Sequence, residues 1–402
     1  MTNQETDANT GRGGSLSDTL WKHDQVGSTA SLELVNGRFL QPTGFPDIGP
    51  CIYRDKDGRR WCLVESEQSM ANRLEAVCMK EPGVWTDDLK GLPVIAVLGP
   101  KDELLTTNLC EPHRCASSYV LDGTINGGRT MKKLFEEKLG LTQSGDSWPL
   151  DRRAELESLV FALDPGALLH GFQFVQWKFV GLRQTRLVHG RLEAELADEP
   201  EVHYGMVKWD AIEPESTREE RANKGQSIAV KSRIVPKKIV AWFEIDLLGL
   251  KALALDDTKK KFLLGLALWK VGAFLGNKPA FDPRSRQTLP SLRLRADCYL
   301  RCKSISWEGN SETGQVSAGD LMQALPGDPP DFAELLSDAL PSETDASGGT
   351  NSGSAGRCAR ENTTPQPEQG QGGTNSGSAG RCAQLYKGPL VKVRYEPKKK
   401  KE

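Results

Sequence analysis

The stretch IVAWFEIDLLGLKALALDDTKKKFLLGLALWKVGAFLG (239–276) holds the strongest structural signals of the sequence. Its first part, 239–250, combines β-branched and aromatic residues and predicts a strand. Its second part, 259–276, predicts a buried helix, because Lys270 interrupts an apolar run too short to cross a bilayer. Strands and helices alternate irregularly in the rest of the chain, with long loops between them. This pattern predicts an α+β sheet domain with insertions.

Further elements are predicted on both sides of this stretch. The segment CIYRDKDGRRWCLVES (51–66) predicts a hairpin that turns at Gly58. The segment 66–80 predicts an amphipathic helix capped by Ser66, and 92–99 predicts a buried strand.

The remaining patterns complete the predicted domain. Residues 113–141 predict a helix, a glycine-rich loop and a second helix, and 178–197 predict a strand followed by a helix. The segment 291–307 predicts a final strand. No P-loop and no G-x-G-x-x-G after the first strand are present.

Composition divides the chain into four parts. Residues 1–18 are polar and glycine-rich and are expected to be disordered, and 19–325 are expected to form the folded domain. Residues 326–383 contain GGTNSGSAGRCA twice and predict a low-complexity linker. Residues 384–402 predict one short strand and a basic tail.

The composition limits the possible functions. The net charge is −2, so a nucleic-acid site requires positive charge sorted onto one surface. The odd number of cysteines, nine, argues against a disulfide framework and favours free thiols in the cytoplasm. Cys110, His113 and Cys115 have no common zinc spacing, and we expect no metal and no other cofactor.

Catalytic patterns are weak. The chain has five histidines and no G-x-S-x-G nucleophile motif. His170 lies in an apolar setting, which favours a structural role, whereas His113 before a predicted helix fits either a polar helix start or an RNA contact. We therefore expect no catalytic residues.

Three segments match the chemistry of nucleic-acid binding. In NGGRTMKK (126–133), two glycines precede Arg129, Lys132 and Lys133 at a helix start, which is an anion site or an ordinary glycine turn. The window 223–238 holds five Lys or Arg, among them Lys231 and Arg233, and no acid. In 293–303, strand alternation puts Arg293, Arg295, Tyr299 and Arg301 on one sheet face, where RRM-like folds bind RNA.

Several segments together resemble one protein family. They are SEQSMANRLE (66–75), HRCASSYVL (113–121), DPGALLHGFQF (164–174), LRQTRLVHGRLEAE (182–195), HYGMVKWDAIEP (203–214) and SLRLRADCYL (291–300). In this order they resemble the backbone subunit of type I-G (formerly I-U) CRISPR surveillance complexes, a member of the RAMP superfamily. The resemblance covers roughly residues 34–305, and Tyr204, Ser291 and Tyr299 depart from its pattern.

The resemblance implies a modified RRM-like (ferredoxin-like) palm with finger and thumb insertions. Several copies would form a helical filament along one CRISPR guide RNA that pairs with target DNA. Other subunits would process the RNA, bind its 5′ handle, form the large subunit and recruit a helicase-nuclease; no membrane is involved. The expected RNA-binding residues are Gln68, Asn72, Arg73, His113, Arg114, Arg129, Lys132, Lys133, Arg183, Arg186, Lys231, Arg233, Arg293 and Arg295.

Two alternatives remain open at this point. The first is a metal-independent RNA endonuclease of the same superfamily, with His113 as general base. The second is a small-molecule enzyme, which would carry no nucleic acid and stay monomeric.

Overall fold

The fold is taken from a computed structural model of the 402-residue chain. It describes residues 15–45, 49–125, 128–141, 152–177, 182–197, 203–205, 231–282, 286–294, 298–340 and 388–397. The chain divides into two compact units. Unit 1 comprises Met1–Leu89, Pro165–Gln173 and Arg183–Pro330, and unit 2 comprises Lys90–Asp164, Phe174–Leu182 and Asp331–Glu402.

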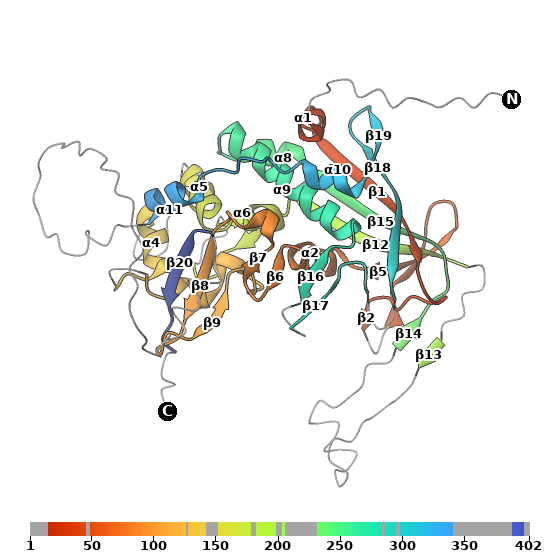
Figure 1. Ribbon diagram of the computed structural model, residues 1–402, viewed down its shortest axis with the longest axis horizontal. Coiled ribbons are helices and arrows are strands. Elements are labelled where there is room, and N and C mark those ends of the chain that lie inside the picture. The colour runs from red at the N-terminus through yellow and green to blue at the C-terminus, as the bar shows by residue number, and fades with distance from the viewer. Residues whose placement is uncertain are drawn as a thin grey trace, which may run out of the picture. The chain divides into compact units, whose positions relative to one another are not determined.

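Unit 1 is built on a seven-stranded antiparallel sheet in the order β19-β18-β1-β15-β12-β5-β4 (Figure 1). Both edges of this sheet are short strands. Its members are β1 (Gln25–Leu34), β4 (Ile52–Arg54), β5 (Arg60–Glu65), β12 (Val188–Leu196), β15 (Pro236–Asp246), β18 (Leu300–Glu308) and β19 (Thr313–Val316).

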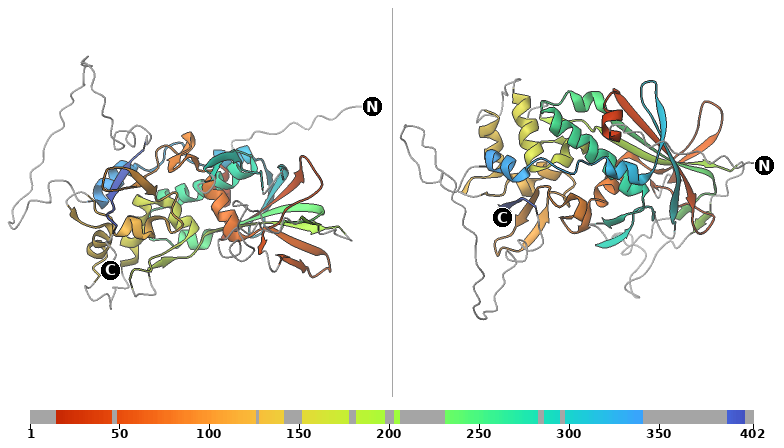
Figure 2. Two further views of the ribbon diagram at one scale, coloured as in Figure 1. Left: turned by 90° about the horizontal axis from the view of Figure 1, so that it is seen from below. Right: turned by 45° about the horizontal axis from the view of Figure 1, so that its top comes forward.

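Helices α2 (Glu67–Ala76) and α9 (Asp257–Leu275) cover one face of this sheet (Figure 2). The strands alternate as a half-buried sheet requires: Val26, Ser28, Ala30 and Leu32 of β1 are buried, and the residues between them are half-exposed. A side chain at Gly190 of β12 would clash with Met70 of α2 and with Phe243 of β15. The glycine therefore lets α2 pack closely on the sheet.

The core of unit 1 has a simple connectivity. The chain runs from β1 through α2 to β12, turns back into β15, and then passes through α9 to β18. In space the four strands lie in the order β18-β1-β15-β12. Both long connections contain a helix on the same sheet face. We define the helix-free face as the opposite face of these four strands, which carries neither α2 nor α9.

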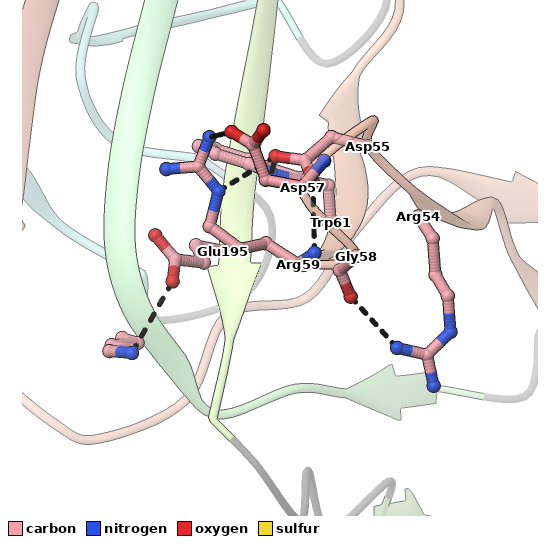
Figure 3. A network of polar contacts seen from close by, with 8 residues as sticks. Arg54, Asp55, Asp57, Gly58, Arg59, Trp61 and Glu195 are labelled. Atoms are coloured by element: carbon pink, nitrogen blue, oxygen red, sulfur yellow. Dashed lines mark hydrogen bonds and ion pairs between the residues drawn. The ribbon is translucent and has the colours of Figure 1, made fainter.

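The predicted hairpin at 51–66 is confirmed as β4 and β5, and Gly58 has the positive φ of 78° that its turn needs. Its tip is held by charged groups (Figure 3). The Asp55 carboxylate accepts hydrogen bonds from the indole N–H of Trp61 (3.0 Å) and from Nε of Arg59 (2.8 Å). Desolvation raises the pKa of Asp55, but these bonds outweigh it and leave the pKa below its ordinary value.

Other elements of unit 1 complete its surface. Helix α10 packs on α9 at Gly272, where a side chain would meet the carbonyl oxygen of Ala318 at 2.8 Å. The other elements are α1 (Leu16–Leu20), β2 (Gly44–Phe45), β3 (Gly49–Pro50), β6 (Met79–Glu81), β7 (Val84–Trp85), η1 (Asp87–Leu89), α6 (Pro165–His170), β10 (Phe172–Gln173), β11 (Arg183–Gln184), β13 (His203–Gly205), β14 (Lys231–Arg233), α8 (Leu247–Lys251), β16 (Pro279–Asp282), β17 (Gln287–Pro290) and α10 (Ala318–Gln323).

Unit 2 contains a three-stranded sheet in the order β20-β8-β9. Its central strand β8 is the predicted buried strand at 92–99, and all its residues are buried. Phe161 of α5 stacks on Phe332 of α11 within this unit. The elements are β8 (Val94–Leu98), β9 (Leu104–Thr107), η2 (Arg114–Ala116), α3 (Ser118–Leu121), α4 (Met131–Lys138), α5 (Arg153–Leu163), α11 (Phe332–Ala339) and β20 (Leu390–Arg394).

The structure corrects two expectations near the ends of the chain. A helix capped by Ser15 begins at Leu16, inside the segment 1–18 that composition predicts to be disordered. Helix α11 lies inside the predicted linker 326–383, because Phe332 and Leu336 give that short segment an apolar face to bury. Both copies of the repeat lie outside the described residues.

Two further predictions of secondary structure are also corrected. The expected helix at the end of 178–197 is strand β12, which pairs with β15 and β5 in the sheet. The segment 291–307 is not one strand. Arg293 and Tyr299 face each other across an isolated antiparallel bridge, so the chain reverses between them. No helix in the described part of the chain is long and apolar enough to span a membrane.

Candidate nucleic-acid interface

Helix α2 presents the polar side chains of the motif SEQSMANRLE. The side-chain oxygen of Ser66 accepts a hydrogen bond from the Ser69 backbone N–H and caps the helix, as predicted. The apolar side of the helix, including Met70 and Leu74, is buried. Gln68 and Asn72 are four residues apart and exposed, so both amides lie on the same open side of the helix. Amide groups can both donate to phosphate or ribose and accept from bases.

Arg73 joins this helix to the sheet. Its Nη2 donates to Oε1 of Glu65 at 2.7 Å, and Nη1 donates to the carbonyl oxygen of Arg293 at 3.3 Å. The Glu65 side chain is fully buried, and the Arg73 side chain is 23% exposed. Ser69 also donates its hydroxyl proton to Glu65. Arg73 therefore acts mainly as a positioning residue that fixes α2 and the backbone at Arg293.

Arg293 is the second cation of this cluster. Its guanidinium carbon lies 5.2 Å from the centre of the Tyr299 ring, in a cation–π contact. Both side chains are half-exposed. Arg293 and Tyr299 thus come together as predicted, but across a turn and not along one strand face. Arg295 lies outside the described residues.

Two further predicted arginines lie beside the start of α2. Arg186 donates from Nη1 to the carbonyl oxygen of Glu67 at 3.4 Å. It is half-exposed, and Arg183 is exposed on β11. His189 Nδ1 lies 3.4 Å from the Glu67 carboxylate. We define the α2 surface as Gln68, Asn72, Arg73, Arg183, Arg186 and Arg293.

Of the cations predicted in 126–133, Lys132 and Lys133 lie in helix α4 of unit 2, and Arg129 lies just before it. Arg129 forms an ion pair with Glu137 at 2.7 Å, and Lys132 lies 3.9 Å from Glu136. Lys132 also lies 5.7 Å from the centre of the Trp177 ring. Lys133 is exposed. We define the α4 surface as Arg129, Lys132 and Lys133; acids one or two turns along the chain neutralise much of its charge.

The side chain of Arg114 forms a buried ion pair within unit 2. It is buried, and its guanidinium binds the buried Asp164 carboxylate through two hydrogen bonds, the one from Nε being 3.0 Å long. Its backbone has a positive φ of 53°, which L residues seldom adopt. The ion pair holds this arginine inside unit 2, so its side chain is not presented to a ligand and we leave it out of the proposed surface.

His113 precedes Arg114 at the start of η2. It is exposed and makes no side-chain capping hydrogen bond. Its neighbour Cys115 is fully buried, and burial raises the pKa of that thiol well above its ordinary value. A zinc ligand must be a thiolate, so this environment disfavours a metal at Cys115. Over the described ranges, no group of three or more His, Cys, Asp or Glu could hold a metal ion.

The acid-free window 223–238 lies largely outside the described residues. Lys231 and Arg233 belong to β14, which pairs with β13, and Arg233 is half-exposed. The side chain of Lys231 is not described. No described contact joins Arg233 to the α2 surface.

A groove on the helix-free face of the unit 1 sheet was not predicted. It encloses about 780 Å³ and crosses β12, β15, β1, β18 and β19. Arg191 lies 5.9 Å from the centre of the Trp242 ring inside it, and the acids Glu67, Glu244 and Glu308 also line it. The alternation of IVAWFEID could have placed Trp242 opposite the buried Phe243, but no sequence signal shows that Arg191 lies beside it.

Part of the chain is similar to a known protein family. Residues 27–199 match the family described as CRISPR-associated protein GSU0053. This matched segment includes most of β1 and all of α2 and β12, and with them most of the α2 surface. Over these residues the chain is similar to a CRISPR-associated family. The resemblance drawn from the sequence motifs is thereby confirmed at this level.

Two solved structures show weak similarity. One is titled "CRISPR RNA-guided surveillance complex, pre-nicking", with a TM-score of 0.33, 13% identity, and coverage of 79% of this chain and 89% of that chain. The other is the crystal structure of Thermofilum pendens Csc2, with a TM-score of 0.26, 11% identity, and coverage of 78% and 74%. A comparison with curated protein sequences gives no match.

Proposed function

We propose that this CRISPR-associated chain is a non-catalytic backbone subunit that binds guide RNA in a type I surveillance complex, of subtype I-G. The observation that carries the proposal is the family match over 27–199, since that segment holds α2 with Gln68 and Asn72 exposed beside Arg186. The α2 surface offers amides for hydrogen bonds and arginines for phosphates. Several copies bind one guide RNA in a filament, in the cytoplasm, and the guide pairs with target DNA.

The strand order supports an RRM-like palm for this subunit. An RRM-like fold has the chain order βαββαβ and places its last strand beside its first. The sequence β1-α2-β12-β15-α9-β18 with spatial order β18-β1-β15-β12 fits that plan. The hairpins β4–β5 and β13–β14 extend from the palm and are candidates for finger or thumb elements.

The partners follow from this role. The α2 surface takes the RNA backbone, while the RNA-processing subunit, the large subunit and the recruited helicase-nuclease perform the other steps. The near-neutral total charge of −2 suits a subunit that must also contact other proteins. Of the 14 residues expected from the sequence, Arg114 is set aside because of its buried ion pair, and the other 13 remain predictions.

The test combines binding with cleavage. Purified full-length protein is titrated against labelled CRISPR repeat RNA and guide RNAs of increasing length, and the products are separated on a denaturing gel. The proposal expects binding that grows with RNA length and leaves the RNA intact. Cleavage that disappears in the His113→Ala variant would overturn it and establish the endonuclease alternative. A protein that binds no RNA of any length would exclude both.

A further inference from the structure

The C-terminal strand β20 occupies a slot in unit 2. It pairs in parallel with β8 over five residues, from Leu390 opposite Val94 to Arg394 opposite Leu98. On its other edge, the backbone groups of Arg394 and Thr124 exchange two hydrogen bonds of 2.8 Å each. We define the strand slot as β8 together with Gly123 and Thr124.

The slot fits this strand closely. Val391 and Val393 of β20 are 3% and 0% exposed. Gly123 leaves the space for Val393, because a side chain there would lie 2.1 Å from its Cγ1. The ring of Tyr395 packs against Tyr119 with centres 4.9 Å apart. The side chains of β20 are therefore specific to the slot, beyond the backbone ladder that any strand could make.

Without β20, the slot would be costly to leave open. All five residues of β8 are buried, and their backbone groups on that edge bond to β20. An open, apolar strand edge invites pairing with another chain. Unit 2 thus requires a strand in the strand slot. The contacts between the slot and β20 are the same whether the strand comes from the same copy of the chain or from another.

The connection to β20 is long. The residues from 341 to 387, 47 in number, separate α11 from the segment that enters the slot. At the maximum of about 3.3–3.6 Å per residue, such a connection reaches at most roughly 170 Å. A folded domain of this size has a radius of gyration of only about 20 Å. The strand is therefore not confined by chain length to the slot of its own copy.

We propose that the strand slot accepts β20 of a second copy of this chain, so that neighbouring copies are joined by strand exchange. The inference rests on the proposed function in one respect: binding to one RNA holds the copies close together. Tethering of this kind gives effective concentrations in the millimolar range, so the neighbour's slot competes with the strand's own. Exchange of an identical element is a low-cost way to link copies.

Thr124 and Arg394 supply the test. Residues that exchange both backbone hydrogen bonds across an antiparallel pair have Cα atoms about 5.5 Å apart, a separation that a disulfide spans. Two full-length chains of different tag size, one Thr124→Cys and the other Arg394→Cys, are expressed together with a CRISPR array. The purified particles are oxidised and run on a non-reducing denaturing gel. Mixtures in which either substitution is omitted control for the native cysteines.

Strand exchange predicts a cross-linked species that contains both chains and requires both substitutions. The result that would overturn it is the absence of this species, while a single chain carrying Thr124→Cys and Arg394→Cys closes completely within itself. The RNA content of the same particles is measured separately. Particles that carry RNA without the cross-link would refute strand exchange and leave the proposed function standing. The cross-link in protein that carries no RNA would support strand exchange and contradict the proposed function.

Discussion

Helices α2 and α4 both carry residues predicted to bind RNA, one in each unit, but their surroundings differ. At the α4 surface, Arg129 is paired with Glu137, and Lys132 lies near Glu136. At the α2 surface, the exposed groups are the amides of Gln68 and Asn72 and the guanidinium of Arg183, and an ion pair holds Arg73 to the buried Glu65. The comparison shows that a cationic run in a sequence does not give the charge of the folded surface, because acids later in the helix lie beside it.

The largest expected effect concerns the buried ion pairs. Arg73→Met removes the guanidinium from the buried Glu65 carboxylate and should lower the free energy of unfolding by about 3 kcal/mol. Arg129→Met breaks a solvent-exposed pair and should cost less than about 0.5 kcal/mol. Urea denaturation of the two full-length variants measures the difference. Equal stability of the two would show that Arg73 does not fix α2 to the sheet.

A second buried ion pair, between Arg114 and Asp164, lies in unit 2. Arg114→Met should also cost about 3 kcal/mol, because it leaves the Asp164 carboxylate buried beside an apolar side chain. The folded variant should bind guide RNA with unchanged affinity. A variant of normal stability with weakened RNA binding would instead place Arg114 on the RNA.

RNA affinity should depend more on α2 than on α4. Gln68→Ala with Asn72→Ala removes two hydrogen-bonding groups worth about 1 kcal/mol each, which corresponds to a roughly thirty-fold weaker binding. Arg129→Ala with Lys132→Ala should weaken it about two-fold, since both cations face acids. Fluorescence anisotropy with guide RNA measures both, and Lys22→Ala, an exposed cation of unit 1, is the control. A larger loss of affinity in the α4 variant than in the α2 variant would place the RNA interface on unit 2.

The salt dependence should separate the same two surfaces. Each phosphate contact on single-stranded RNA contributes about 0.7 to the slope of log affinity against log salt concentration. Arg183→Ala with Arg186→Ala should therefore reduce the slope by about 1.4. Arg129→Ala should leave the slope as it is in the unmodified chain. A flat salt response of the unmodified protein would contradict phosphate binding altogether.

The smallest expected effect is a gain in RNA affinity when the acids beside the α4 surface are removed. Glu136→Gln with Glu137→Gln removes the acids that face Arg129 and Lys132, and should raise RNA affinity about two-fold to three-fold through the freed charge. The same anisotropy titration detects it. Unchanged affinity would show that the α4 surface does not approach the RNA at all.

Local signals predicted the elements of the fold where one pattern dominated. The Asp-Gly turn of the hairpin, the Ser66 cap and the alternation in IVAWFEID lie close together in sequence and determine their own geometry. The strand at 188–196 was predicted as a helix, because its pairing with β15 and β5 is a long-range contact that local spacing does not show. The antiparallel bridge between Arg293 and Tyr299 is likewise a contact that strand alternation does not predict.

The candidate site was predictable only in part. The motif 66–75 identified the exposed Gln68 and Asn72, because helix periodicity places both on one side. The burial of Arg114 depends on Asp164, which is 50 residues away along the chain. The pairing of Arg191 with Trp242 likewise depends on the register between β12 and β15. Such contacts require the three-dimensional fold.

The proposed function requires several copies of this chain to bind one guide RNA. Its most direct test is to purify the full-length protein from cells that express it with a CRISPR array, and to measure RNA content by the ratio of absorbance at about 260 and 280 nm, together with particle mass. The account predicts array-derived RNA bound by several copies of the chain. Nucleic-acid-free, monomeric protein would contradict it.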